Sequence, residues 1–360
     1  MDFSAIEQKN EHFYAPRFEV EIDGENLLRK GVAVTGVEVV EKLNDSARFS
    51  ITVNDRFDVD SETFLWLDSP LFQVGKEVNI RMGYGSNLQT MIIGRIETAN
   101  SSLFSSASPT LSAEGYDLSY QFLKKPSPAR PFDKAKDSDI VQTLAGEAGL
   151  TAAVDPSDEI HQKVIKKGDT SYFDFLRERA DRIGYEFYVS GRTLFFVKPK
   201  EDREELFSLE WGKNLISFNP SMSLASVVTE VEVRGWDNRN KKEIIGSARA
   251  GDERTQEKGK KKASEVAREA GGEVKKVIFW PVSSAQEAAN LAQARVNRAN
   301  ENFIEGSGST IGFPELRSGI LIGLRKLGKR FSGKYRLTET THTIDSGGYR
   351  VNFRARRNAV

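Results

Sequence analysis

The chain has 360 residues, 38% of them hydrophobic and 10% aromatic. This is enough apolar mass to build buried cores, and at about 150 residues per domain it predicts two to three domains. The formal charge is zero, because 52 Lys and Arg balance 52 Asp and Glu, so a dedicated binder of nucleic acid or anionic lipid is disfavoured. The chain contains no cysteine, which excludes disulfides, thiolate metal sites and thiol nucleophiles.

The balanced charge conceals an uneven distribution along the chain. Residues 1–100 hold 10 Lys and Arg against 17 Asp and Glu, whereas residues 319–360 hold 10 against 2. Oppositely charged regions are typical either of an ordinary mixed surface or of self-association through complementary faces. The N-terminal region has no apolar core of signal-peptide length, and the longest apolar runs are too short to cross a bilayer, so neither export by the usual routes nor membrane insertion is expected.

The first 118 residues predict β structure. Apolar and polar residues alternate over strand-length windows, for example at Phe18-Val20-Ile22 and Phe49-Ile51-Val53, and turn residues such as Asp23-Gly24 separate the windows. At least five strands are expected with no long helix, which favours a barrel or a sandwich.

From residue 119 to 204 the apolar period changes to that of helices. One helix is expected after Asp137, ending near Gly149, and a second between Asp169 and Gly184. A hairpin through Ser190-Gly191 then completes a small α+β module.

Residues 205–247 and 305–360 again predict strands, and residues 248–304 form an insertion between them. Within the insertion, residues 249–276 are highly charged and lack aromatic residues, which indicates a solvated, flexible stretch that could still hold a short exposed helix ending at Gly271-Gly272. Ser284 and Glu287 form a capping box that opens a further helix through about Phe303. Two β domains carrying insertions are therefore the simplest organisation.

The motifs of common enzymes are missing from the sequence. Each of His12, His161 and His342 is interpreted as a structural or exposed residue, since no metal-binding spacing surrounds any of them. No nucleophile elbow or phosphate-binding loop is present. We therefore predict no catalytic, cofactor-binding or metal-binding residues, no cofactor, and a protein that is not an enzyme.

Many short pieces along the chain share their order and spacing with one family. The sequence resembles the late control D family, the baseplate hub proteins of contractile phage tails and related injection systems, and the hub part of type VI secretion spike proteins. The resemblance is nearly full length and is carried by Gly115-Tyr116-Asp117, Thr170-Ser171-Tyr172-Phe173-Asp174-Phe175-Leu176, Gly184-Tyr185-Glu186-Phe187, Ser217-Phe218-Asn219-Pro220, Gly235-Trp236-Asp237, Gly312-Phe313-Pro314 and Phe331-Ser332-Gly333-Lys334-Tyr335.

This resemblance implies a fold and an assembly. The expected fold is mixed and β-dominated, with tail-tube-like β-barrel domains at 1–118 and at 205–247 plus 305–360, an α+β module at 119–204 and a charged, helical insertion at 248–304. It implies a homotrimer that forms a pseudo-sixfold ring and joins the tail tube to a central spike. Expected partners are further copies of the chain, a tail tube or tube-initiator protein and other baseplate proteins. The spike is expected to be a separate protein, because the chain ends at Val360 right after its last strands.

The expected setting is assembly in a bacterial cytoplasm, followed by incorporation into the baseplate of a phage tail or injection-system particle. For the subunit interface, we expect basic faces of the second β domain to meet acidic faces of the first, with Arg325, Lys326, Lys329, Arg330 and Arg336 as candidates. His342 and Trp236 are interpreted as packing residues.

Two alternative functions remain open. A receptor- or carbohydrate-binding tail protein would expose an aromatic patch drawn from Trp66, Trp211, Trp236 and Trp280. A peptidoglycan hydrolase, the weaker alternative, would need a carboxylate pair or metal ligands in a cleft.

Overall fold

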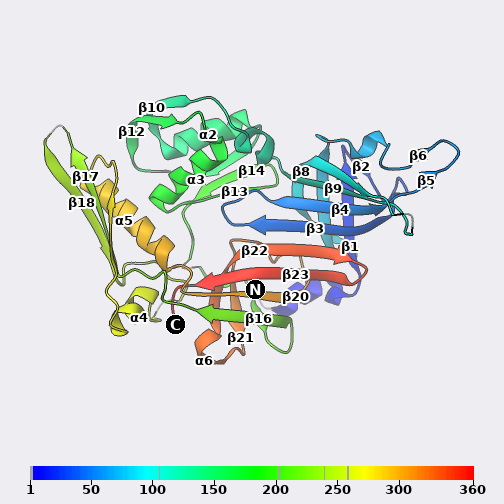
Figure 1. Cartoon of the computed structure of the whole chain (residues 1–360). Coiled ribbons are helices and arrows are strands. Elements are labelled where there is room, and N and C mark those ends of the chain that lie inside the picture. Colours follow the sequence, from blue (N-terminus) through cyan, green and yellow to red (C-terminus); the bar gives the residue numbers. More distant parts are fainter. Residues whose placement is uncertain (1–2, 105, 202, 239, 258) are drawn as a thin grey trace.

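The largest feature of the protein is a 13-stranded sheet, here called the main sheet, which passes through both predicted β regions (Figure 1). The computed structural model describes residues 3–104, 106–201, 203–238, 240–257 and 259–360. Along the main sheet the strands follow the order β16-β20-β23-β22-β3-β4-β9-β8-β7-β1-β2, and β15 and β21 join it through β22. The predicted β-dominated, mixed fold is confirmed.

The first β unit comprises the strands up to residue 117. Apolar residues alternate along its longer strands, so that one side of each is buried and the other is more exposed. Its elements are α1 (Phe3–Lys9), β1 (Pro16–Ile22), β2 (Glu25–Asn26), β3 (Val34–Lys42), β4 (Arg48–Asn54), the hairpin strands β5 (Phe57–Asp58) and β6 (Thr63–Phe64), β7 (Glu77–Tyr84), β8 (Asn87–Ser102) and β9 (Thr110–Asp117).

The second β unit comprises the remaining strands of the main sheet. These are β15 (Ser208–Glu210), β16 (Leu215–Met222), β20 (Ile304–Ile311), β21 (Leu321–Arg325), β22 (Gly333–Asp345) and β23 (Gly348–Arg357), with the short helix α6 (Gly328–Phe331) between β21 and β22.

The two β units are joined by backbone pairing and share one core. Strand β22 pairs antiparallel with β3, from Glu339 opposite Lys42 to Ile344 opposite Val37. Beneath the pairing, buried residues of both units, such as Ile51 and Val351, belong to a single hydrophobic cluster. The two units therefore form one continuous sheet with one apolar side.

The α+β module packs around its own core, in which Leu144, Phe173 and Phe187 are buried. Helix α3 begins after Ser171, whose hydroxyl accepts a hydrogen bond from the Asp174 N–H at 3.0 Å, so the predicted helix is confirmed. The module contains β10 (Arg130–Lys136), α2 (Asp137–Glu147), β11 (Thr151–Val154), β12 (Ile160–Lys166), α3 (Tyr172–Ile183), β13 (Glu186–Ser190) and β14 (Thr193–Val197).

A separate three-stranded sheet, here called the small sheet, lies at one end of the molecule, opposite the β5–β6 end (Figure 1). It contains β17 (Glu230–Asp237), β18 (Lys242–Arg249) and β19 (Lys275–Phe279), and one of its faces packs on α5 (Ala285–Asn300). Strands β17 and β18 lie mostly within the range expected for the second β domain, but they pair with β19 and share a core with α5 instead.

The interpretation of 249–276 as a flexible, solvated stretch is wrong for much of its described length. Helix α4 (Ala263–Glu269) contributes Ala263 and Ala267 to the core of the β units. Glu253 is buried and accepts a hydrogen bond from the Ser264 N–H at 3.0 Å, and the backbone of Lys261 bonds that of Val360 in both directions. The high charge of the segment indicates a solvated stretch, but these few contacts are enough to hold it against the β units. Within the described ranges, the helices are all too short or too polar to cross a membrane.

Candidate functional site

One face of the main sheet is polar over eight consecutive strands, from β16 to β8. The cross-strand register places Ser217, Ser309, Asn352 and Thr341 side by side. The side chains on this polar face are mostly Ser, Thr, Asn, Glu and Arg, as in Ser217, Asn219, Ser221, Glu305, Ser307, Ser309, Arg350, Asn352, Arg354, Glu339, Thr341, Thr343, Glu38, Lys42, Arg48, Ser50, Thr52, Ser112, Glu114, Thr98, Asn100 and Ser102.

The opposite side of the same strands is buried and mostly apolar, with Thr340 and His342 of β22 as buried polar residues. Phe353, next to Asn352, is 2% exposed, and Gly308 has no room for a side chain because Phe353 Cζ would lie 2.6 Å from its Cβ. The polar face is hollowed over the second β unit by depressions of about 280 Å³ and 450 Å³ that share Asn219, Ser307 and Arg354 in their linings. Small polar side chains thus leave open space along this face.

The structure separates the five predicted interface residues. Arg336 is only 4% exposed, and its guanidinium donates to Glu186 Oε2 at 2.6 Å. It therefore leaves the candidate set, because a side chain buried against the module has no surface left for a neighbouring subunit. Arg325 and Lys326 are more accessible, and they form ion pairs within the chain with Glu205 and Glu210 respectively.

Lys329 and Arg330, on α6, are exposed like Lys326. Neither forms an ion pair with another described residue. A basic residue of the second β unit also pairs with an acidic residue of the first within the same chain. Arg317 donates from Nε to Glu41 Oε2 at 2.7 Å. This contact was not foreseen from the sequence, which gives no signal for a pair so far apart along the chain.

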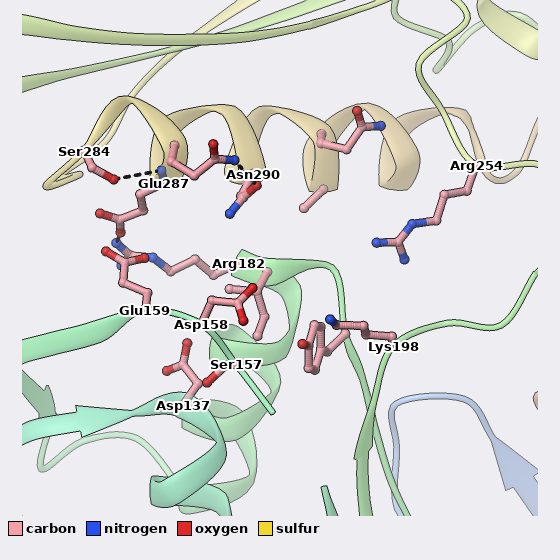
Figure 2. A pocket seen from close by; sticks show the side chains of 15 residues that line it. Asp137, Ser157, Asp158, Glu159, Arg182, Lys198, Arg254, Ser284, Glu287 and Asn290 are labelled. Carbon is pink, nitrogen blue, oxygen red and sulfur yellow. Dashed lines mark hydrogen bonds and ion pairs between the residues drawn. The ribbon is translucent and has the colours of Figure 1, made fainter. Parts of the chain in front are cut away.

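A pocket of about 410 Å³ lies between the α+β module and α5 (Figure 2). Asp137 at the start of α2 and Arg182 of α3 line one side, and Glu287 and Asn290 of α5 line the other. The Ser284 hydroxyl accepts the Glu287 N–H at 3.0 Å, which confirms Ser284 as the N-cap of this helix. The Glu287 carboxylate accepts from the Ser283 N–H at 2.6 Å, so the reciprocal half of the predicted capping box is not the contact observed.

Behind the pocket wall, Asp137 forms a buried ionic cluster with Arg179 and His161. Arg179 Nε donates to Asp137 Oδ1 at 2.5 Å, and His161 Nε2 lies 2.6 Å from Arg179 Nη2 and 3.3 Å from Asp137 Oδ2. Burial would raise the pKa of Asp137, but His161 and Arg179 hold it below its ordinary value. This cluster joins α2, α3 and β12, in accord with the structural interpretation of His161.

Beside it, Glu159 and Glu287 form a carboxylate pair that the sequence analysis missed, because the two residues are distant in the chain. Burial raises the pKa of Glu159, and the neighbouring Glu287 raises it further. Burial acts on Glu287 in the same sense, but hydrogen bonds from Glu159 and from the Ser283 N–H at 2.6 Å, together with Arg182, bring its pKa below the usual range. The opposite directions mean that, of the two, Glu159 takes up a proton first as the pH falls.

The same pair and His161 have ligand atoms within 4.8 Å of one another and could hold a metal ion. However, the Glu287 carboxylate already accepts from Arg182 and from the Ser283 N–H, and the Ser283 hydroxyl lies 2.9 Å away. The Arg182 guanidinium already supplies a positive charge to the Glu287 carboxylate. The arrangement fits an ion-pair clamp between α3 and α5 better than a metal centre.

The remaining sequence candidates divide into buried and exposed residues. His342 is fully buried, with Nδ1 2.8 Å from the Tyr349 hydroxyl and Nε2 2.7 Å from the Leu316 carbonyl, and burial lowers its pKa to about 4. Its interpretation as a packing residue is confirmed. The same interpretation is wrong for Trp236, which is 57% exposed on the small sheet; His12 is also largely exposed.

Solved structures of similar fold come from phages and secretion systems. The chain is similar to the 43 kDa tail protein of prophage MuSo2 from Shewanella oneidensis, with 13% identity, a TM-score of 0.72 and coverage of 95% of this chain and 98% of that one. A tail protein from Neisseria meningitidis MC58 has 12% identity, a TM-score of 0.70 and coverage of 95% and 97%.

A third similar structure is the Escherichia coli c3393 protein, described as a component of the type VI secretion system. It has 12% identity, a TM-score of 0.57 and coverage of 94% of this chain and 77% of that chain. At these identities the likeness establishes a shared fold, that of phage tail proteins.

Sequence comparison gives a family as well as a fold. A search of curated proteins finds no match. The family model of the Alg8 N-terminal domain, in contrast, matches residues 14–346, nearly the whole chain. The chain therefore belongs to the Alg8 N-terminal domain family.

Proposed function

We propose that this chain is the structural baseplate hub of a contractile tail or injection system, related to the late control D hubs. In this proposal three copies close into a pseudo-sixfold ring that joins the tail tube to the central spike. The observation that carries it is the polar face, which continues from one β unit to the other, with Val40 opposite Thr341 as an apolar residue at the junction. A chain with two joined β units of this kind contributes two of six sectors to such a ring.

The polar face suits the wall of a water-filled channel. Sheet faces that pack on other protein are apolar, whereas a face of Ser, Thr and Asn with scattered charges is stable in contact with water. Small side chains such as Ser217 and Ser307 also keep the wall thin and the space beside it open. Facing the lumen, this surface would let cargo or a spike pass without adhering to it.

The ends of the polar face supply the joints between copies. Strand β16 is an edge of the main sheet. At the other end, residues 98–102 of β8 pair on one side with β9, and no strand of the described residues pairs with their other side. Open strand edges invite pairing, and joining two different edges is a heterologous contact, the kind that closes rings.

Other features of the assembly follow as parts of the same proposal. The partners would be a tail tube or tube-initiator protein, the spike and further baseplate proteins, and the chain would reside in the baseplate of the particle. As domain division we propose the two β units, the α+β module and an insertion that includes β17 and β18 with β19 and α5, since those strands share its core. Lys329 and Arg330 are retained as interface candidates.

Introduced cysteines can test the ring directly, because the chain has none of its own. A variant with Asn219→Cys on β16 and Asn100→Cys on β8, treated with a short bis-maleimide in the assembled particle or in the presence of the spike, should give a covalent ladder that stops at three subunits. Each single variant should give no more than a dimer. A double variant that stays monomeric, or one that forms chains beyond three, would contradict the proposed ring.

A further inference from the structure

The outer face of the small sheet carries four exposed apolar side chains. Trp236 of β17, Ile245 of β18, and Val277 and Phe279 of β19 are 57%, 46%, 43% and 78% exposed. Arg234 lies opposite both Ile245 and Phe279 in the register, so these residues surround it on three adjacent strands. We call this set the apolar patch. Contiguous exposed apolar surface of this kind marks a site of interaction with another protein.

The patch has no role in the core of the insertion. The opposite face of the sheet supplies that core, where Val231 and Val233 are fully buried against Leu291 of α5. Gly246 lies so close to α5 that a Cβ would be 2.2 Å from the Ala289 nitrogen. The sheet is therefore already packed on one side, and the apolar side chains of the other side are not explained by folding.

The charged side chains around the patch neutralise one another. Arg234 pairs with Glu232 at 2.5 Å and with Glu243 at 3.3 Å, and Lys275 pairs with Glu230 at 3.0 Å and with Glu232 at 2.6 Å. Nucleic acid or an anionic membrane would require unpaired cations here. A partner with apolar side chains and no net charge is the complementary match, since it leaves these ion pairs intact.

We propose that the apolar patch docks a protein other than this chain, through an apolar and uncharged surface of that protein. The exclusion of a second copy rests on the proposed function, in which copies meet at β16 and β8. The small sheet lies at the end of the molecule opposite the β5–β6 hairpin (Figure 1), so it stays accessible in such a ring. Trp236 and Phe279 would be the central contacts, since buried aromatic residues dominate interfaces of this kind.

A photo-cross-linker can identify what covers the patch. Ser247 is exposed on the same face, opposite Glu232, and benzoylphenylalanine at this position in the intact particle should cross-link to a different protein, identified by mass spectrometry. The matched position is Ser307 on the polar face, which should give no link to that protein. A Ser247 link to another copy of this chain, or no protein link at all, would overturn the proposal.

The energetic contribution of the patch is tested with the identified protein in purified form. Trp236→Ser with Phe279→Ser should weaken its binding by about 30-fold or more. Val59→Ser with Leu65→Ser, which removes exposed apolar side chains at the opposite end of the molecule, should leave the binding unchanged. Both variants should keep the urea midpoint of the parent, because the altered residues lie outside the cores.

Equal binding of the purified protein by the patch variant and by the parent would overturn the proposal. The proposal would also be overturned if the patch variant lost binding to a soluble polysaccharide while its binding to the protein was unchanged. The two proposals can fail separately. If only the proposed ring is wrong, the cysteine ladder would be absent while the Ser247 cross-link to a different protein would persist.

Discussion

The protein exposes two sheet faces of opposite chemistry. The polar face of the main sheet presents small hydroxyl and amide side chains such as Ser309 and Asn352, whereas the outer face of the small sheet presents Trp236 and Phe279. Both belong to sheets whose other side is a hydrophobic core. The difference shows that exposure alone says little about use. A polar sheet face is stable in contact with water, whereas an exposed apolar sheet face indicates a site that another molecule covers.

The sequences of the strands already contain this contrast. In β23, apolar and polar residues alternate, as at Val351, Asn352 and Phe353. In β19 the run from Val277 to Phe279 is apolar on both sides. Since a strand that is apolar on both sides needs cover on both sides, β19 indicates a missing partner, whereas β23 does not.

The sharpest test of the two sides of the main sheet uses neighbours on β23. Phe353→Ala should lower the free energy of unfolding by about 3–5 kcal/mol, because it removes a buried aromatic ring and leaves a cavity. Asn352→Ala, one residue away on the polar face, should change it by less than about 0.5 kcal/mol. Urea unfolding followed by circular dichroism measures both. A large loss for Asn352→Ala would mean that the polar face is packed against protein and is not the wall of an open channel.

A second test uses pH to ask whether the core side of β22 is dry. Burial lowers the pKa of His342 to about 4 from 6.5, so this group contributes full stability above pH 6.5 and loses it as the pH falls toward 4, since only the unfolded chain binds the proton. The parent should lose about 2–3 kcal/mol more stability between pH 7 and pH 4.5 than His342→Gln. Parallel urea titrations at the two pH values give this difference, and equal losses in the two proteins would show that the imidazole is hydrated.

Local elements were predictable from sequence, whereas contacts between distant segments were not. Helices α3 and α5 follow from the caps at Ser171 and Ser284, which act within a few residues. The Glu159 and Glu287 pair, by contrast, is brought together only by the packing of the module on α5. Likewise Arg336 resembles any basic strand residue in sequence, and only the fold places it in contact with Glu186.

The smallest expected effect concerns charge on α6. Lys329→Glu with Arg330→Glu should weaken association between copies by about 0.2–1 kcal/mol per residue, as is usual for exposed ion pairs, and the effect should shrink as salt rises. Light scattering over a concentration series measures the shift in subunit equilibrium. Arg325→Glu is the matched comparison, because its parent side chain pairs with Glu205 inside the chain, and the reversal should act through that contact. If the α6 variant associates as strongly as the parent at low salt, backbone pairing at the strand edges holds the copies together and charged side chains do not. The main sheet would then contact its neighbours through its edges, whereas the small sheet binds its partner through the apolar patch on its face.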